Sequence, residues 1–199
     1  MIYASERDTP RVQAERALYR ELSAALDLHR VKFIDESGLN LALTRLYGRA
    51  PGGARVLGSA PRNYGPNVTM LGALSCTGLE AVMTVEGATD AAVFRAYVRE
   101  VLCPTLRAGD LVVADNLSAP KAAGVQEAIA ATGARLLYLP PYSPDLNPIE
   151  HCWSKIKTFL RAAKARTREA LDAALTRALA TVTESDARAW FAHCGYVLH

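Results

Sequence analysis

The sequence lacks any long uninterrupted run of apolar residues. A membrane-spanning helix needs roughly 20 such residues, and no run in the 199-residue chain approaches that length. The opening stretch, MIYASERDTP, also lacks the apolar centre of a signal peptide. Because 50% of the residues are hydrophobic, the chain can bury a sizeable core and is not a disordered polypeptide. We therefore expect a soluble cytoplasmic protein.

Closely spaced cysteine pairs are also missing. The chain has four cysteines, at positions 76, 103, 152 and 194. No two of them form the Cys-x-x-Cys pair that is typical of a zinc knuckle or a redox site. Because the cytoplasm is reducing, we expect free and mostly buried thiols.

Acidic residues are absent from residues 37–79, while arginines are frequent there. These arginines are Arg45, Arg49, Arg55 and Arg62. A second basic run, KIKTFLRAAKARTR, covers residues 155–168. The net charge of +3 is too small to indicate a polyanionic partner by itself, and basic runs also occur on ordinary solvated surfaces. Two such runs beside an acidic site would instead favour a DNA-binding surface.

Hydrophobic periodicity predicts an α/β fold. Strands are expected over residues 31–35, 67–75, 79–85, 111–115 and 135–139, and helices over 10–28, 89–106, 120–131, 148–165 and 167–182. Residues 44–66 are rich in Gly, Pro and Arg, which predicts a long loop or an irregular hairpin. Three antiparallel strands, followed by parallel strands joined through helical crossovers, make a mixed sheet flanked by helices. This is the ribonuclease H-like order.

Three acidic residues stand at the ends of predicted elements. Asp35 ends the first strand and Asp115 ends the fourth, at the sheet edge where open α/β sheets bind ligands. Glu150 starts a helix directly after the segment PPYSPDLNPIE. Each proline fixes its own φ and restricts the residue before it. The segment is therefore stiff and holds Glu150 in a fixed place.

Two of these acids also have a simpler structural interpretation. Asn147, Pro148 and Glu150 fit the start of a capped helix, and the pair Asp115-Asn116 fits a turn after a strand. Glu36 points away from Asp35 because neighbouring residues of a strand face opposite sides; we expect Glu36 to be a hydrogen-bonding neighbour. The joint occurrence of all three acids on these elements favours a functional site.

Three segments carry a resemblance to a known family: IDE at 34–36, VVADN at 112–116 and LPPYSPDLNPIEHCWSKIK at 139–157. They resemble the catalytic core of the mariner-type DDE transposases, in the bacterial insertion-sequence branch. The resemblance runs from about residue 4 to the end of the chain. Its most specific part is YSPDLNPIE together with an Asp that is separated from the Glu by 34 residues.

The resemblance implies that Asp35, Asp115 and Glu150 are catalytic and bind two Mg²⁺ ions, with Asp35 bridging them. Mn²⁺ is expected to substitute for Mg²⁺. Two such metals stabilise the attacking and leaving oxygens when a phosphodiester is displaced, and Mg²⁺ prefers oxygen ligands. Glu36 and Asn116 are expected beside the metal-binding carboxylates. The expected DNA contacts are Arg45, Arg49, Arg55, Arg62, Lys121, Lys155, Lys157 and Arg161.

The implied activity is metal-dependent DNA strand cleavage and strand transfer of an insertion sequence, with a TA step as its target. TA steps deform easily, which suits a bent target. The expected partners are element-end and target DNA, a helix-turn-helix product of an upstream frame and a second copy in a homodimer. The expected location is the bacterial cytoplasm, associated with the nucleoid. The alternative is a catalytically inactive DNA-binding or dimerisation remnant.

The resemblance also suggests a division of the chain and shows one departure. We expect an N-terminal helical extension over residues 1–30, a catalytic domain over 31–165 and C-terminal helices over 166–199 that pack on the same domain. Pro120 precedes Lys121 at the place where relatives commonly carry a histidine.

Overall fold

The computed structural model describes residues 4–116 and 123–197. Its strands form one five-stranded sheet in the order β3-β2-β1-β4-β5. The strands are β1 (Val31–Leu39), β2 (Val68–Ser75), β3 (Gly78–Glu86), β4 (Leu111–Ala114) and β5 (Arg135–Tyr138). The first three strands are antiparallel, and β4 and β5 run parallel to β1. This is the ribonuclease H-like mixed sheet that the sequence predicted.

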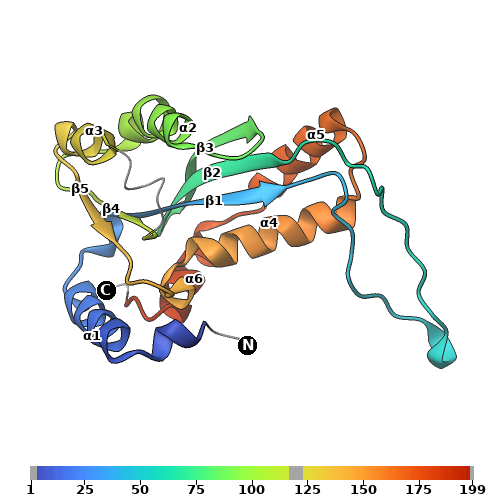
Figure 1. The fold of residues 1–199 in the computed structure, drawn as a ribbon, viewed down its shortest axis with the longest axis horizontal. Coiled ribbons are helices and arrows are strands. Elements are labelled where there is room, and N and C mark those ends of the chain that lie inside the picture. The colour runs from blue at the N-terminus through green and yellow to red at the C-terminus, as the bar shows by residue number, and fades with distance from the viewer. Residues whose placement is uncertain (1–3, 117–122, 198–199) are drawn as a thin grey trace.

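Helices cover both faces of this sheet. They are α1 (Pro10–Ala24), α2 (Ala91–Tyr97), α3 (Val125–Ala131), α4 (Ile149–Ala163), α5 (Arg168–Leu179) and α6 (Glu184–His193). Figure 1 shows α2 and α3 on the face opposite to α4. Within the described residues, none of these helices has both the length and the apolar character that crossing a membrane requires.

Alternating side chains of the strands fill two separate cores. On β1, Phe33 belongs to the core under α4, α5 and α6, whereas Ile34 belongs to the core under α2 and α3. On β4, Val113 and Val112 alternate in the same way. This two-residue period fixes the face toward which each later residue of a strand points. All four cysteines are free and three of them are buried, as the sequence predicted.

The main differences from the predicted elements come from tertiary pairing. β1 continues to Leu39 instead of ending at Asp35, because β2 pairs with it as far as Leu39 and Val68. The helix α1 ends at Ala24, four residues before its predicted end. α6 was not predicted as a separate helix, although a capping box formed by Thr183 and Asp186 starts it.

Residues 44–66, here called the basic arm, form an irregular loop between β1 and β2 that projects from the body (Figure 1). Arg166 ties down the base of the basic arm: its guanidinium donates to the carbonyls of Leu41 and Leu43 at 2.8 and 2.9 Å. The predicted irregular loop is therefore confirmed. Its base is held by Arg166, which follows α4 in the sequence.

A test of the core follows from Gly72, which pairs with Asp35 across β1 and β2. A Cβ atom at Gly72 would lie 2.9 Å from the Cη2 atom of the buried Trp153. We expect Gly72→Ala to lower the free energy of unfolding by about 1–3 kcal/mol because the indole must shift. Urea unfolding measures this.

Gly38→Ala is the matched control for this substitution. Gly38 lies on β1, the strand that pairs with the one carrying Gly72, and a Cβ atom at Gly38 would meet nothing within 4 Å. Its stability should stay the same or rise slightly, because alanine loses less backbone entropy than glycine on folding. Equal stabilities for the two variants would contradict the close packing of Trp153 on the sheet.

Candidate active site

The pairing of β1 with β4 brings two of the predicted acids together. Ile34 and Ala114 form the last pair between these parallel strands, and Asp35 and Asp115 each follow directly. Phe33 and Val113 face the core under α4. By the two-residue period of a strand, the two acids lie on this same side of the sheet.

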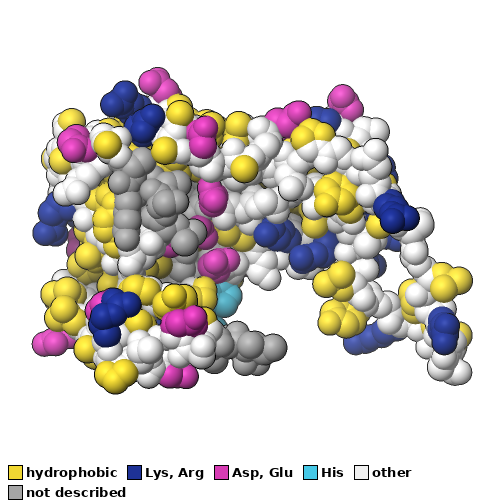
Figure 2. All heavy atoms as spheres, in the orientation of Figure 1, with side chains coloured by type: hydrophobic (Ala, Val, Ile, Leu, Met, Phe, Trp, Pro, Cys, Tyr) yellow, Lys and Arg dark blue, Asp and Glu magenta, His cyan; other side chains and the backbone are white. Residues whose placement is uncertain are grey.

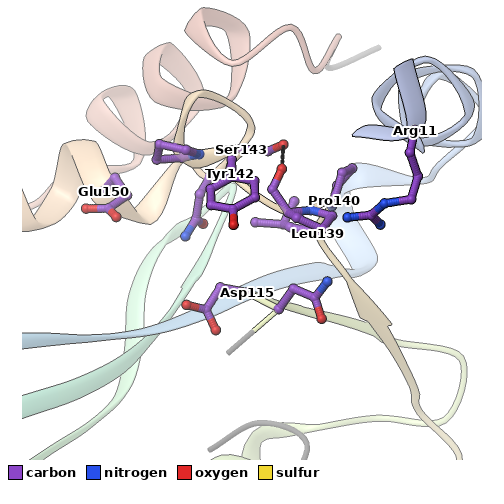
Figure 3. Close-up of a pocket in the computed structure, with 11 residues that line it drawn as sticks. Arg11, Asp115, Leu139, Pro140, Tyr142, Ser143 and Glu150 are labelled. Atoms are coloured by element: carbon purple, nitrogen blue, oxygen red, sulfur yellow. Dashed lines mark hydrogen bonds between the residues drawn. The ribbon is translucent and has the colours of Figure 1, made fainter. Parts of the chain in front are cut away.

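Glu150 reaches the same place through residues 139–148, here called the proline segment. The segment leaves β5 with a hydrogen bond from the Leu139 N–H to the Ala114 carbonyl at 2.8 Å. It then makes a short 3₁₀ turn over Pro144–Leu146 before α4 begins. Glu150 lies in the first turn of α4. Asp115 and Glu150 line one pocket of about 510 Å³ (Figure 3).

A buried ion pair holds the proline segment against α1. Arg16 is 1% exposed and donates to both carboxylate oxygens of Asp145, at 3.0 and 2.7 Å. It also donates to the Ser143 hydroxyl at 2.6 Å, and Arg7 lies 3.2 Å from Asp145. Burial alone would raise the pKa of Asp145, but Arg16 and Arg7 lower it below its usual value. The stiffness expected from the prolines is thus reinforced by a contact that the sequence did not reveal.

The three carboxylates influence each other electrostatically. Burial and then the charge of Glu150 raise the pKa of Asp35 from 3.8 to about 8, and Asp115 adds to the effect. The pKa of Glu150 is also raised, by burial and by Asp115, against the opposing charge of Lys157. Gathered carboxylates of this kind favour a cation, and oxygen donors suit Mg²⁺. Within 4–116 and 123–197, however, no three His, Cys, Asp or Glu side chains are arranged closely enough to hold a metal.

Asn147 takes part in the site instead of capping the helix. α4 starts from Pro148, without a capping hydrogen bond from a side chain in the described part of the chain. The side-chain amide of Asn147 is buried and donates a long hydrogen bond, 3.5 Å, to Asp35. Asn147 also lines the pocket with Glu150. The capping interpretation of this stretch is therefore wrong.

Trp153 lies one turn after Glu150 on α4, and its indole interacts with Asp35. Its indole N–H is buried without a regular hydrogen bond among the described residues, yet it lies close enough to Asp35 to lower the pKa of that carboxyl. The backbone N–H of Glu36 donates to Asp35 at 2.8 Å. Three neighbouring groups therefore orient Asp35, and only Glu36 was expected from the sequence.

The other predicted site residues fall into distinct places. Asn116 lines the pocket beside Asp115. The Glu36 side chain is exposed, and only its backbone bonds to Asp35. Lys155 is engaged in the body, where it donates to Asp186 at 2.6 Å and to the Thr181 carbonyl at 2.8 Å.

The predicted DNA contacts are brought close to the acids only in part. The charge of Lys157 acts to lower the pKa of Glu150. Arg161 lies further along the same helix, α4. The arginines of the basic arm are all exposed, at positions 45, 49, 55 and 62. Pro120 and Lys121 lie outside the described residues.

Comparison with known proteins places the chain in a family. The family model described as DDE superfamily endonuclease matches residues 30–172. This span holds all three acids and most of the chain. The chain therefore belongs to the DDE superfamily endonucleases. No curated protein matches it.

Solved structures share the fold at low sequence identity. The Mos1 transposase paired-end complex with left transposon end matches with a TM-score of 0.76 and 16% identity, over 98% of this chain and 62% of that chain. The Mos1 strand transfer complex matches with a TM-score of 0.72 and 16% identity, over 97% and 60%. The catalytic domain of Mos1 mariner transposase matches with a TM-score of 0.70 and 14% identity, over 97% and 91%. The chain thus spans less than two thirds of the longer Mos1 chains and nearly all of the catalytic domain.

The raised pKa of Asp35 predicts how stability depends on pH in the metal-free protein. Between about pH 4 and about pH 8 the folded state keeps a proton that the unfolded state has lost, so stability falls as pH rises through this window. Each pKa unit corresponds to about 1.4 kcal/mol. We expect Asp35→Asn to be more stable than the parent at pH 8, with a difference that shrinks toward pH 4. Thermal melting in EDTA measures this.

Asp172→Asn serves as the control for this pH profile. Asp172 is an exposed carboxylate of α5 that pairs with Arg168 on the same helix. Its stability curve should run parallel to that of the parent over the whole window. A parallel curve for Asp35→Asn as well would show that the pKa of Asp35 is not raised in the folded protein.

Proposed function

We propose that this chain is the catalytic domain of a transposase that cuts DNA at the ends of an insertion sequence and joins the 3′-ends to a target. The observation that carries the proposal is the proximity of Asp35, Asp115 and Glu150: Asp115 and Glu150 line one pocket, and burial together with the charges of both raises the pKa of the neighbouring Asp35. The family membership and the fold support it, because the similar Mos1 structures include a transposase complex with a transposon end.

The three carboxylates would hold two divalent ions, Mg²⁺ or Mn²⁺. Structures of Mos1 contain Mg in some cases and Mn in others. When bound, such ions stabilise the attacking and leaving oxygens of a phosphodiester. The raised pKa values of Asp35 and Glu150 support this fit: burial is the larger cause, and a cation would relieve the added repulsion from Glu150 on Asp35 and from Asp115 on both.

The remaining residues of the site position these carboxylates. Asn147 and the Glu36 N–H donate to Asp35 and favour its charged form. Lys157 balances the charge of Glu150. The ion pair of Arg16 and Asp145 keeps the proline segment in place and so fixes the start of α4. A preorganised set of oxygen ligands costs no rearrangement at the moment of reaction.

The DNA backbone would run from the pocket along α4 to the basic arm. Lys157 and Arg161 follow Glu150 by seven and eleven positions, which places the three side chains on one face of a helix. α4 extends from the pocket toward the base of the arm (Figure 1). Figure 2 shows Lys and Arg side chains on the arm and on the body next to it, and acidic side chains in the middle of the same face.

We also propose the partners that the sequence suggests: TA-containing target DNA, a helix-turn-helix product of an upstream frame, and a second copy of this chain, in the nucleoid of a bacterial cell. The basic arm supports a protein contact, because Leu46, Tyr47 and Leu57 are 72, 90 and 89% exposed. An inactive remnant is the less favoured function, since all three acids are present and act on one another through their charges.

Glu150→Gln tests the assignment of the metal ligands. The substitution keeps the size of the side chain but removes its charge, so we expect DNA cleavage in Mg²⁺ to fall by orders of magnitude. The melting temperature of the metal-free protein should stay the same or rise slightly, because one repelling charge is removed. A cleavage assay on DNA carrying the element's own ends, with the upstream product supplied, measures the first effect.

Glu169→Gln is the matched control. Glu169 is the second residue of α5, as Glu150 is of α4, and it is exposed. It should cleave at the parental rate. A Glu150→Gln variant that also cleaves at the rate of an active parent would remove Glu150 from the metal-binding set.

Salt dependence tests the role of the basic arm. Each phosphate that the protein neutralises adds about 0.9 to the slope of log affinity against log salt on duplex DNA. We expect replacement of Arg45 and Arg49 by Gln to make this slope shallower by roughly one for each arginine that binds a phosphate. Arg177→Gln, on an exposed position of α5, should leave it unchanged. Equal slopes for the parent and all variants would show that the arginines of the basic arm do not bind phosphates and form an ordinary solvated surface.

A further inference from the structure

The pocket that contains Asp115 and Glu150 extends well beyond the acids. Its volume of about 510 Å³ lies in the range of roughly 300–1,000 Å³ that is usual for organic ligands. One wall is the proline segment from Leu139 to Pro144, and Arg11 of α1 lines the far side. Figure 3 shows Glu150 and Arg11 on opposite sides of this pocket, with the wall from Leu139 to Pro144 between them, a layout that metal binding alone does not require.

Tyr142 is the large aromatic side chain of this wall, and its backbone is strained. Its φ is 55°, in the left-handed region that residues other than glycine rarely adopt. Such strain persists where the surroundings impose it, and it clusters at ligand sites. The side chain is 47% exposed, so the strain is not explained by burial of the ring in the core. Figure 3 shows Tyr142 between Glu150 and Arg11, with Asp115 facing it.

The backbone on both sides of Tyr142 is locked. Pro141 precedes it, and the Ser143 hydroxyl after it donates to the Pro141 carbonyl at 3.0 Å. Ser143 in turn accepts from the buried Arg16 at 2.6 Å. A half-exposed aromatic ring on a rigid backbone loses little entropy when a base stacks on it.

Arg11 supplies a positive charge at the opposite rim. Its guanidinium points toward the pocket from α1 (Figure 3). It pairs with Glu15 at 2.6 Å, but the two side chains are 69 and 40% exposed. Exposed pairs of this kind contribute little, so a phosphate can replace the Glu15 carboxylate.

We propose that this pocket is a nucleotide subsite, in which the DNA nucleotide next to the scissile phosphate stacks its base on Tyr142 while Arg11 binds the adjoining backbone phosphate. The proposal rests on the proposed function for the scissile phosphate at the carboxylates. The base must leave its neighbours in the duplex to reach the ring, which is easiest at an unpaired strand end. Tyr142 and Arg11 thereby set the direction in which the strand enters the site.

Fluorescent oligonucleotides test this subsite. The probe is a short single-stranded DNA that carries one 2-aminopurine, placed in turn at each position, with Ca²⁺ present to support binding without cleavage. We expect the full chain to quench the fluorescence at one or two adjacent positions. Tyr142→Phe should preserve the quenching. Tyr142→Gly should abolish it and weaken binding about 5- to 150-fold, the fold-change equivalent to removing one base stack.

Glycine is the informative replacement because it adopts a φ of 55° without strain. Folding should therefore survive in Tyr142→Gly, with an unchanged or higher melting temperature. Ala81→Gly is the matched control: Ala81 has a φ of 50° on β3, away from the pocket. Ala81→Gly should likewise have an unchanged or higher melting temperature, and it should quench the fluorescence to the same extent as the parent. Arg11→Gln should keep the quenching but reduce the salt slope of binding to this single-stranded probe by about 0.7.

Two results distinguish this inference from the proposed function. Position-specific quenching that depends on Tyr142, in a protein that does not cleave DNA, would support the subsite and contradict the catalytic proposal. Normal cleavage with quenching and affinity unaffected by Tyr142→Gly would overturn the subsite and leave the catalytic proposal standing.

Discussion

The structure depends on keeping Asp35, Asp115 and Glu150 near one another although burial and like charge both disfavour the charged forms of Asp35 and Glu150. Burial and the neighbouring charges raise the pKa of Asp35 to about 8, so the site stores electrostatic energy that the rest of the fold must offset. Asp35 lies within β1, Asp115 directly follows β4, and Glu150 lies in the first turn of α4, so regular backbone hydrogen bonds hold these positions. Gly72 adds to this support, since the absence of a Cβ atom lets Trp153 approach the sheet opposite Asp35.

The strongest support for this arrangement comes from residues far away in sequence. Arg16, in α1, is buried against Asp145 and Ser143 of the proline segment. From the other end of the chain, the Tyr196 hydroxyl donates to the Leu146 carbonyl at 2.7 Å. A buried guanidinium without its partner would leave an uncompensated charge. The first helix and the C-terminal segment are therefore part of the scaffold that positions Glu150.

The strands and most helices could be predicted from the sequence because their signals are local. Hydrophobic periodicity and turn residues predicted the strands in their order, and the proline segment marked Glu150. Contacts between distant residues leave no such local signal. Nothing in the sequence indicated that Arg16 pairs with Asp145. The sequence favoured a helix cap for Asn147, which instead donates to Asp35. It favoured a DNA contact for Lys155, which instead pairs with Asp186.

The sequence by itself determined the strands, their mixed antiparallel and parallel pairing, and the positions of Asp115 after a strand and Glu150 at a helix start, because these follow from short-range sterics and side-chain period. Only the tertiary structure decided that Asn147 turns to Asp35, that β1 continues past Asp35 to Leu39, and that Tyr142 faces a pocket shared with Arg11. Those features depend on which surfaces meet once the chain is packed. The strain at Tyr142 is sustained only when partners from other elements are already in place.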